Sequence, residues 1–306
     1  MTRVSVVIPT KDRGPLLAQS LGTVLRQLDV DLEVVVVDDG SVSPARRWVS
    51  PDPRVRVVRN AAPTGVSAAR NRGIAEARGE WIAFLDDDDV WAPDKLTAQL
   101  TAVTATGCDW AYTGEVAVDD GLRLRGGVPP PRPEEVVAGL EGFDAVPAGA
   151  SNVFVQRGLL DHVGGFDPRL RTSEDWDMWI RLGRKALPAC VARPLVAYRV
   201  RAGTASRQMA QALRDAELVA RRHGIDFDRR RFLRWAAWTS LEDGRRTAAV
   251  AYYLRSAAAG DVRSVGRAVI ATFHPGVVQR HTGPPYDPWL AQAREWLAEI
   301  PHVEPE

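Results

Sequence analysis

Residues 81–91 read Trp-Ile-Ala-Phe-Leu-Asp-Asp-Asp-Asp-Val-Trp, an apolar run that leads directly into four consecutive carboxylates, Asp86 to Asp89. Such a run is typical of a buried strand that emerges at a site. Adjacent like charges repel one another by about 1 kcal/mol for each close pair in water. A solvated acidic turn is one interpretation of the four. We favour a site for a hard divalent cation, Mg²⁺ or Mn²⁺, because the acids follow a strand and are fixed by Trp91-Ala92-Pro93.

Two earlier strands also end in polar residues. The run Val4 to Ile8 leads into Pro9-Thr10-Lys11-Asp12-Arg13, and Val34 to Val37 leads into Asp38-Asp39-Gly40-Ser41. A run of β-branched residues as uniform as the second is typical of a parallel strand that is covered on both faces. Ligands of parallel sheets bind at the carboxyl ends of the strands, so we expect the three polar strand ends to converge on one crevice.

The segments between these strands complete an α/β pattern. Apolar residues three and four apart predict helices over 16–28 and 66–77, and residues 54–58 predict a further short strand. The order β-α-β-β-α-β over the first ninety residues predicts a doubly wound α/β sheet, mainly parallel and flanked by helices, with right-handed crossovers.

Two common phosphate-binding motifs are missing. No Gly-x-Gly-x-x-Gly follows the first strand, and no Gly-x-x-x-x-Gly-Lys-Ser/Thr occurs in the chain. A dinucleotide fold or a P-loop NTPase is therefore disfavoured. If phosphates bind at the strand ends, a cation must bridge them to the acidic cluster, which fits a nucleoside diphosphate.

Taken together, the motifs resemble the signature series of family 2 glycosyltransferases, which have the GT-A fold. The resemblance is close over residues 1 to about 105 and looser to about 206, and the last hundred residues show no specific likeness. It rests on the following stretches: Val4 to Thr10, Val36 to Ser41, Ala68-Ala69-Arg70-Asn71-Arg72-Gly73-Ile74, Gly79 to Asp89, Gly164 to Asp167, Ser173 to Asp177, and Tyr198-Arg199.

The resemblance implies a nucleotide-sugar site at the first strand ends. Thr10 and Asp39 take the positions that line the base pocket, where Asp39 accepts a hydrogen bond from the base. Asp38 has an alternative interpretation as a turn residue. The Asp-x-Asp element maps to Asp86 and Asp88, with Asp88 the expected metal ligand and Asp86 on the ribose or on metal-bound water; the register within the four acids is open by one. The implied site also includes Pro9, Arg13, Arg70 and Asp87.

A further acidic motif begins at Ser173. In similar enzymes the Asp of its Glu-Asp pair is the general base, which points to Asp175 beside Glu174, with Asp177 as the alternative. A helix start alone would explain Glu174, because acids are favoured in the first turn. A carboxylate that takes the proton of an attacking sugar hydroxyl contributes about 10²–10⁴-fold to a rate. The resemblance thus implies a metal-dependent displacement with inversion at the anomeric carbon.

Other residues are candidates for substrate contacts. Similar sequences often carry His at the position of Arg201, and Arg199 or Arg201 is expected to hold the pyrophosphate here. Trp176, Trp91 and Trp110 are candidates for stacking on sugar faces, although core positions are the more common use of tryptophan. UDP is the expected donor nucleotide, with GDP and TDP as alternatives, and the acceptor is a glycan, a lipid-linked sugar or a small molecule.

Composition and segment pattern bound the rest. The 306 residues carry a formal net charge of +1, which gives no case for nucleic-acid binding. Two cysteines, an N-terminal strand in place of a signal peptide, and no apolar run near twenty residues favour a cytoplasmic protein without a membrane span. We expect a GT-A domain over 1–205, with an irregular excursion at 121–150 that borders the acceptor, and a C-terminal helical appendage over 206–306.

The appendage is expected to form helices at 206–222, 229–241, 245–259 and 262–273. Peripheral contact with anionic lipid through Arg263, Arg267 and Arg280 is an alternative to a solvated helix face. Two competing functions stay open: a sugar nucleotidyltransferase, which would need a glycine-rich loop after the first strand, and a non-catalytic nucleotide-sugar or protein-binding module on the same fold.

Overall fold

The computed structural model describes residues 3–200, 209–242, 244–273 and 287–301, and these divide into two compact units. Unit 1 holds residues up to 140, 144–200 and the segment from 286 onward, and unit 2 holds 141–143 and 201–285. The sequence-based boundary at 205 lies close to the end of the second stretch of unit 1, at Val200. The last helix, α12 (Asp287–Leu297), belongs to unit 1 and not to the helical appendage.

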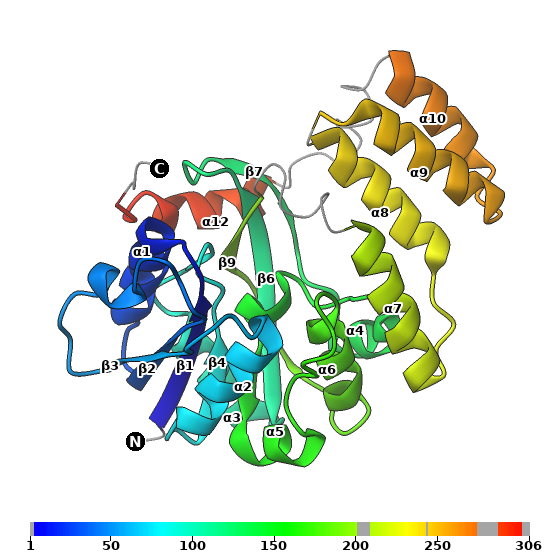
Figure 1. Cartoon of the computed structure of the whole chain (residues 1–306). Coiled ribbons are helices and arrows are strands. Elements are labelled where there is room, and N and C mark those ends of the chain that lie inside the picture. Colours follow the sequence, from blue (N-terminus) through cyan, green and yellow to red (C-terminus); the bar gives the residue numbers. More distant parts are fainter. Residues whose placement is uncertain (1–2, 201–208, 243, 274–286, 302–306) are drawn as a thin grey trace. The chain divides into compact units, whose positions relative to one another are not determined.

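The first half of unit 1 has the predicted α/β pattern. Its elements are β1 (Arg3–Thr10), α1 (Gly14–Leu25), β2 (Asp31–Asp38), η1 (Ala45–Trp48), β3 (Val55–Arg59), α2 (Val66–Glu76) and β4 (Trp81–Phe84). These four strands are parallel and lie in the order β3-β2-β1-β4 (Figure 1). Val34 to Val37 are buried on both faces, as their uniform β-branched run predicts.

The second half of unit 1 continues the sheet with mixed directions. Its elements are β5 (Val90–Trp91), α3 (Lys95–Thr106), β6 (Trp110–Val118), β7 (Leu124–Val128), α4 (Pro133–Leu140), η2 (Gly149–Asn152), β8 (Phe154–Gln156), α5 (Arg157–Val163), α6 (Glu174–Gly183) and β9 (Ala189–Arg199). The strand order continues β4-β8-β6-β9-β5, with β7 paired to β6. The β4–β8, β6–β8 and β5–β9 pairs are antiparallel, so only the first half of the sheet is purely parallel.

The segment 121–150 is more regular than the sequence suggests, because it contains β7 and α4. Pro133 opens α4, where a missing N–H costs nothing, and Glu134 and Glu135 follow in the first turn. Val136 and Leu140 then bury the inner face of the helix. Five prolines and glycines directly precede this helix, so the sequence predicted irregular structure and the short apolar pattern of α4 was not recognised.

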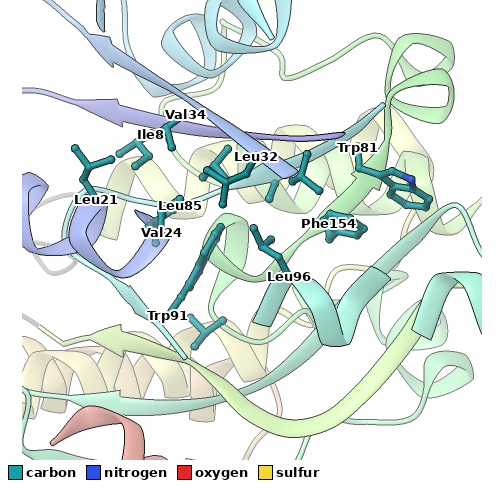
Figure 2. Close-up of a cluster of buried hydrophobic side chains, with 14 of the residues drawn as sticks. Ile8, Leu21, Val24, Leu32, Val34, Trp81, Leu85, Trp91, Leu96 and Phe154 are labelled. Atoms are coloured by element: carbon teal, nitrogen blue, oxygen red, sulfur yellow. The ribbon is translucent and has the colours of Figure 1, made fainter. Parts of the chain in front are cut away.

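The main core lies between the sheet and its covering helices (Figure 2). Ile8 and Val34 from the central strands pack with Leu21 of α1 and Leu96 of α3, and all are buried. The rings of Trp81 and Phe154 stack with 4.7 Å between centroids, which joins β4 to β8. The parallel strands are thereby held in fixed register, and the residues that follow them are held in fixed positions.

A second core attaches α12 to strands β6, β7 and β9. Trp289 and Leu290 pack against Val116 of β6 and Ala197 of β9. The indole N–H of Trp289 donates to the carbonyl of Glu115 over 3.0 Å, and a Cβ at Gly114 would lie 2.1 Å from its ring. Gly114 is therefore needed for this close approach.

The described part of unit 2 contains helices α7 (Met209–His223), α8 (Arg229–Glu242), α9 (Arg246–Ala258) and α10 (Arg263–Phe273). The four helices occur where the sequence predicts them, apart from residues 206–208, which lie outside the described part of the chain. Ala237, Ala249, Tyr253 and Ala268 form a small core between α8, α9 and α10. No helix in the described ranges combines the length and the apolar character that crossing a membrane requires.

Candidate active site at the strand ends

The ends of β1 and β4 meet because their register is fixed. Val7 pairs with Phe84, so three residues further along Thr10 comes to lie beside Asp87. The Thr10 hydroxyl donates to the Asp87 carboxylate over 2.6 Å. Pro9, one residue earlier, is buried opposite Val37 of β2. Thr10 also pairs with Asp38, so the ends of β1, β2 and β4 lie next to one another.

The four acids Asp86 to Asp89 alternate between two environments. Asp86 and Asp88 are partly exposed, whereas Asp87 and Asp89 are buried. Arg13 reaches both kinds of residue, because its Nη1 lies 3.0 Å from Asp87 and 2.8 Å from Asp88. The Asp-x-Asp pair that is open to a ligand is therefore Asp86 and Asp88, which is the register that the resemblance implies.

The buried pair has internal partners. Asp89 accepts hydrogen bonds from the Ser151 hydroxyl over 2.5 Å and from the backbone N–H of Arg199 over 2.8 Å. Burial raises the pKa of Asp89 well above its ordinary value, and the charge on Asp88 adds to this effect. Burial and the same charge raise the pKa of Asp87 to about 7, although Arg13 and Thr10 oppose the rise. Asp87 and Asp89 therefore connect the turn after β4 to β1, to η2 and to β9 through hydrogen bonds.

A buried arginine connects the strand ends with α6. The guanidinium of Arg70 on α2 donates to Asp86 over 2.6 Å and to Glu174 over 2.7 Å, and it lies over the ring of Phe166. Burial lowers the pKa of Arg70, but Asp86 and Glu174 outweigh this and raise it overall. One positive charge cannot neutralise every acid around it, so burial and the charge on Asp175 raise the pKa of Glu174 to about 7.

The start of α6 presents Asp175. Ser173 before it has a left-handed backbone conformation with φ of 58°, and Asp175 accepts a hydrogen bond from the Trp176 N–H over 2.8 Å. Burial raises the pKa of Asp175, while Arg70 and the Trp176 N–H lower it in part. A Cβ at Gly149 would lie 2.8 Å from the Asp175 carboxylate, so the η2 backbone approaches this group closely.

Asp177, the alternative base, has a different position. It is buried, and its Oδ2 accepts two hydrogen bonds from Arg181, at 2.7 Å and 3.0 Å. This i,i+4 pair inside α6 stabilises the helix. Of the two aspartates, Asp175 is the one whose carboxylate lies beside Arg70 and Glu174.

The two aspartates after β2 accept hydrogen bonds from the neighbouring loops. Asp38 accepts hydrogen bonds from the N–H groups of Ser41 and Ala45, which gives it the turn role that the sequence left open. Asp39 accepts from the N–H groups of Thr64 and Gly65 and from the Asn60 amide. Burial raises the pKa of Asp39, but these hydrogen bonds outweigh it and lower the pKa overall. Asp39 is thus an ionised carboxylate that orders residues 60–65.

Comparisons with known proteins agree with this arrangement. Residues 5–154 match the model of Glycosyl transferase family 2. The chain carries a family 2 glycosyltransferase domain. It is 29% identical over 192 residues to TuaG of Bacillus subtilis, a protein assigned to teichuronic acid biosynthesis, and the match covers 61% of this chain and 74% of TuaG.

Two further similar proteins are a named glucosyltransferase and a protein of known structure. The domain is 32% identical over 111 residues to Escherichia coli WfgD, a UDP-Glc:alpha-D-GlcNAc-diphosphoundecaprenol beta-1,3-glucosyltransferase, covering 36% of this chain and 44% of WfgD. The structure of S. aureus TarS 1–349 in complex with UDP-GlcNAc has a TM-score of 0.59 at 18% identity, covering 88% of this chain and 81% of that one. The TarS likeness shows the fold, which is GT-A.

Several predicted contacts of the family 2 domain are corrected by the structure. Trp91, Trp110 and Trp176 are all buried, and each indole N–H donates to a backbone carbonyl, at Ser151, Ala186 and Leu140 respectively. They are core residues in place of the sugar-stacking positions that the sequence suggested. Their satisfied N–H groups could not be read from the sequence.

Arg199 is also used internally. It is buried at the end of β9, and its guanidinium donates to the carbonyls of Asp88 and Asp120 and to the side chain of Gln19. The expected contact between Arg199 and pyrophosphate is therefore replaced by a structural role beneath the four acids. Arg201 lies outside the described residues.

Two acids near α6 escaped the sequence interpretation. Burial raises the pKa of Glu115 on β6 to about 7, and burial together with the charge on Asp175 raises the pKa of Asp144 well above its usual range. Glu115 is the one charged residue of strand β6, and a single charge in such a strand was a readable signal. Asp144 lies in a loop without a motif, so the sequence offered no signal for it.

The residues of the family 2 domain fit a divalent cation in a limited way. Across the described ranges, no three His, Cys, Asp or Glu side chains are arranged to hold a metal ion. Mg²⁺ and Mn²⁺ sites in nucleotide enzymes often use only one or two carboxylates, with phosphates and water as the remaining ligands. The partly exposed pair Asp86 and Asp88 matches that smaller requirement.

Proposed function

We propose that this protein transfers a sugar from a nucleoside diphosphate donor, UDP in the first instance, to an acceptor hydroxyl with inversion at the anomeric carbon. The observation that carries the proposal is the Arg70 bridge. It joins Asp86, on the ligand side of the four acids, to Glu174, which immediately precedes Asp175. In the proposed function, donor contacts and a proton acceptor would thereby lie around one buried guanidinium.

The donor would occupy the ends of β1, β2 and β4. Asp39 and the loop that it orders would contact the base, as the family resemblance implies, and Arg13 would approach the diphosphate. Arg13 is suited to this because its side chain is 37% exposed while it also contacts Asp87 and Asp88. An arginine shared between carboxylates can exchange one of them for a phosphate oxygen.

A divalent cation would be held by Asp88 and Asp86 together with the diphosphate oxygens. When bound, it supplies positive charge that stabilises the leaving diphosphate. The protein side chains then determine where the donor sits: Thr10 and Arg13 fix Asp87, and Ser151 fixes Asp89, so the intervening Asp88 has a defined position.

Asp175 would act as the general base. As the acceptor oxygen forms its bond to the anomeric carbon, its proton passes to the Asp175 carboxylate, and the electron pair of the broken bond leaves with the diphosphate. Attack from the face opposite the leaving group inverts the configuration. A base with a raised pKa binds the proton more strongly than an ordinary aspartate does, which favours this transfer near neutral pH.

The acceptor class is proposed from the relatives. WfgD is named for a diphosphoundecaprenol-linked sugar acceptor and TuaG for teichuronic acid biosynthesis. We therefore place a lipid-linked glycan first among the acceptors, with a soluble glycan or small molecule as the alternatives.

A donor screen tests the proposal. Hydrolysis and transfer are measured with UDP-, GDP- and TDP-sugars, with and without Mn²⁺, for the wild type, Asp175→Asn and Asp177→Asn. We expect one nucleotide to support Mn²⁺-dependent turnover in the wild type. Asp175→Asn should lose turnover. Asp177→Asn should lose turnover only in proportion to any loss of folded protein.

Other results would favour the competing functions. Release of pyrophosphate from a nucleoside triphosphate and a sugar phosphate would indicate a nucleotidyltransferase. Tight UDP-sugar binding without turnover for any acceptor would indicate a binding module. Metal-independent turnover would remove the cation from the proposal and leave the base assignment intact.

A further inference from the structure

Helix α10 has its large apolar side chains on the face that points away from unit 2. The side chains that pack toward α9 are the small ones, Ser264, Ala268 and Ala271, and these are buried. The exposed set consists of Val262 (76% exposed), Val265 (50%), Val269 (55%), Ile270 (38%) and Phe273 (72%).

This pattern is the reverse of an ordinary surface helix. At 3.6 residues per turn, the four exposed large apolar residues of the helix, Val265, Val269, Ile270 and Phe273, form one continuous stripe, and Val262 in the turn before the helix extends its start. We call these five residues the α10 stripe. A surface helix normally turns such a stripe toward the core. Helices α8, α9 and α10 lie side by side in that order, so α10 is at the edge of this group (Figure 1). A contiguous exposed apolar patch of this kind marks a contact surface.

The charge of the two units indicates what the surface contacts. Unit 2 contains 15 arginines and 8 acidic residues, a net charge of +7, while the remainder of the chain contains 25 basic and 31 acidic residues, a net charge of −6. The overall value of +1 conceals this division. A basic unit that presents an apolar helix face has the two features that hold a helix in the surface of an anionic bilayer.

The basic side chains lie next to the α10 stripe. Arg263 and Arg267 fall on the helix between the stripe and the face that packs on α9. Asp261, in the turn before α10, accepts hydrogen bonds from Arg234 of α8 over 3.0 Å and from Arg267 over 3.3 Å. The start of α8 therefore lies near the start of α10, and it adds the exposed Arg229, Arg230 and Arg231 to the same end of unit 2.

We infer that unit 2 binds the surface of an anionic lipid bilayer, with the α10 stripe in the headgroup region and the arginines at the start of α8 and α10 on the lipid phosphates. This inference does not depend on the proposed chemistry, because it uses no residue of the strand ends. It would place a transferase beside acceptors that are carried on lipid.

Vesicle flotation of the full chain tests the inference without nucleotide or acceptor. The probes are vesicles of phosphatidylcholine alone and vesicles in which about one third of the lipid is phosphatidylglycerol, each at low and high salt. The test variant is Val265→Asp/Val269→Asp, and Arg263→Glu tests the charge. Leu187→Asp is the matched control, since Leu187 is an apolar residue of similar exposure (49%) in unit 1.

We expect the wild type to bind anionic vesicles about tenfold better than neutral ones and to lose this preference at high salt. The double variant should lose at least about tenfold of that binding, Arg263→Glu about fivefold, and Leu187→Asp less than about twofold. All variants should keep the wild-type melting temperature and turnover on a soluble acceptor.

Two results would overturn the inference. One is binding of the double variant equal to that of the wild type. The other is a wild type that does not bind vesicles and instead forms a dimer which the double variant converts to monomer, because the stripe would then be a contact between two copies of the chain. Loss of turnover in the strand-end variants would leave the inference untouched.

Discussion

Acidic residues occur on both sides of Arg70, but the two sides treat their charge differently. On the strand-end side, Asp39 faces backbone N–H groups and Asp88 faces Arg13. On the α6 side, Asp144, Glu115 and Asp175 lie near one another, and burial raises the pKa of each. On the strand-end side the acids with a raised pKa, Asp87 and Asp89, are the two buried members of the four, and the partly exposed Asp86 and Asp88 alternate with them. Under the proposed function, the first side would contact the donor and the second would supply the proton acceptor.

The largest effect on turnover is expected at Asp88, one of the two partly exposed acids. Asp88→Ala should lower transfer by about 10³-fold or more, because the cation would lose its main protein ligand. The fold should survive, since removing this carboxylate relieves repulsion and leaves Arg13 paired with Asp87. Turnover and the melting temperature are measured at saturating Mn²⁺. Wild-type turnover in this variant would show that the cation is held elsewhere.

Its buried neighbour should behave in the opposite way. Asp89→Ala removes the acceptor of the Ser151 hydroxyl and of the Arg199 N–H, and leaving two buried donors unpaired costs about 2–4 kcal/mol. Denaturant unfolding measures this loss. At a temperature where the variant is folded, its nucleotide affinity should stay within a few-fold of the wild type. A stable variant that does not bind nucleotide would place Asp89 in the ligand site.

The base pocket gives a smaller effect. Asp39→Ala should weaken UDP binding by about 1.5–3 kcal/mol at saturating metal, because a charge-assisted hydrogen bond and the ordered loop are lost. Calorimetry with UDP and with pyrophosphate separates base from phosphate: only the UDP affinity should fall. Equal UDP affinity in both proteins would restrict Asp39 to ordering residues 60–65.

The α6 side makes a prediction about pH. The pKa of Glu115 is about 7 in the folded protein and near 4.5 when unfolded, so the native state holds a proton that the unfolded state loses first. Stability should fall as the pH rises from 4.5 to 7, whereas Glu115→Gln lacks this loss. The variant should gain about 1–3 kcal/mol relative to the wild type over that range. The free energy of unfolding is measured for both proteins across this pH range. If it depends on pH in the same way in both, the raised pKa of Glu115 is contradicted.

The sequence predicted the strand-end side better than the α6 side, for physical reasons. β1, β2 and β4 are short apolar runs with polar ends, and parallel register alone brings Thr10 to Asp87. The four acids could not be sorted by sequence, because the path of the turn that follows β4 decides which two are buried. The Arg70 bridge joins residues 104 positions apart, and no local pattern encodes it.

The return of α12 to the first unit was equally hidden. In the sequence, Trp289 looks like any apolar residue of an amphipathic helix. Its contact with Gly114, 175 positions earlier in the chain, is visible only in the structure. The same applies to the three buried tryptophans, whose indole N–H groups found carbonyl partners that only the tertiary structure supplies. The burial of the apolar strands was readable from the sequence, whereas the partners of polar groups and the burial of individual acids were not.

The separation of donor binding from proton transfer is tested most directly by one variant, Asp175→Asn, in three measurements. The substitution keeps the size of the side chain and removes its capacity to accept a proton. We expect donor affinity within a few-fold of the wild type, an unchanged melting temperature, and turnover lower by at least about 10²-fold. Near-normal turnover with a lower melting temperature would contradict this account, because Asp175 would then only stabilise the start of α6.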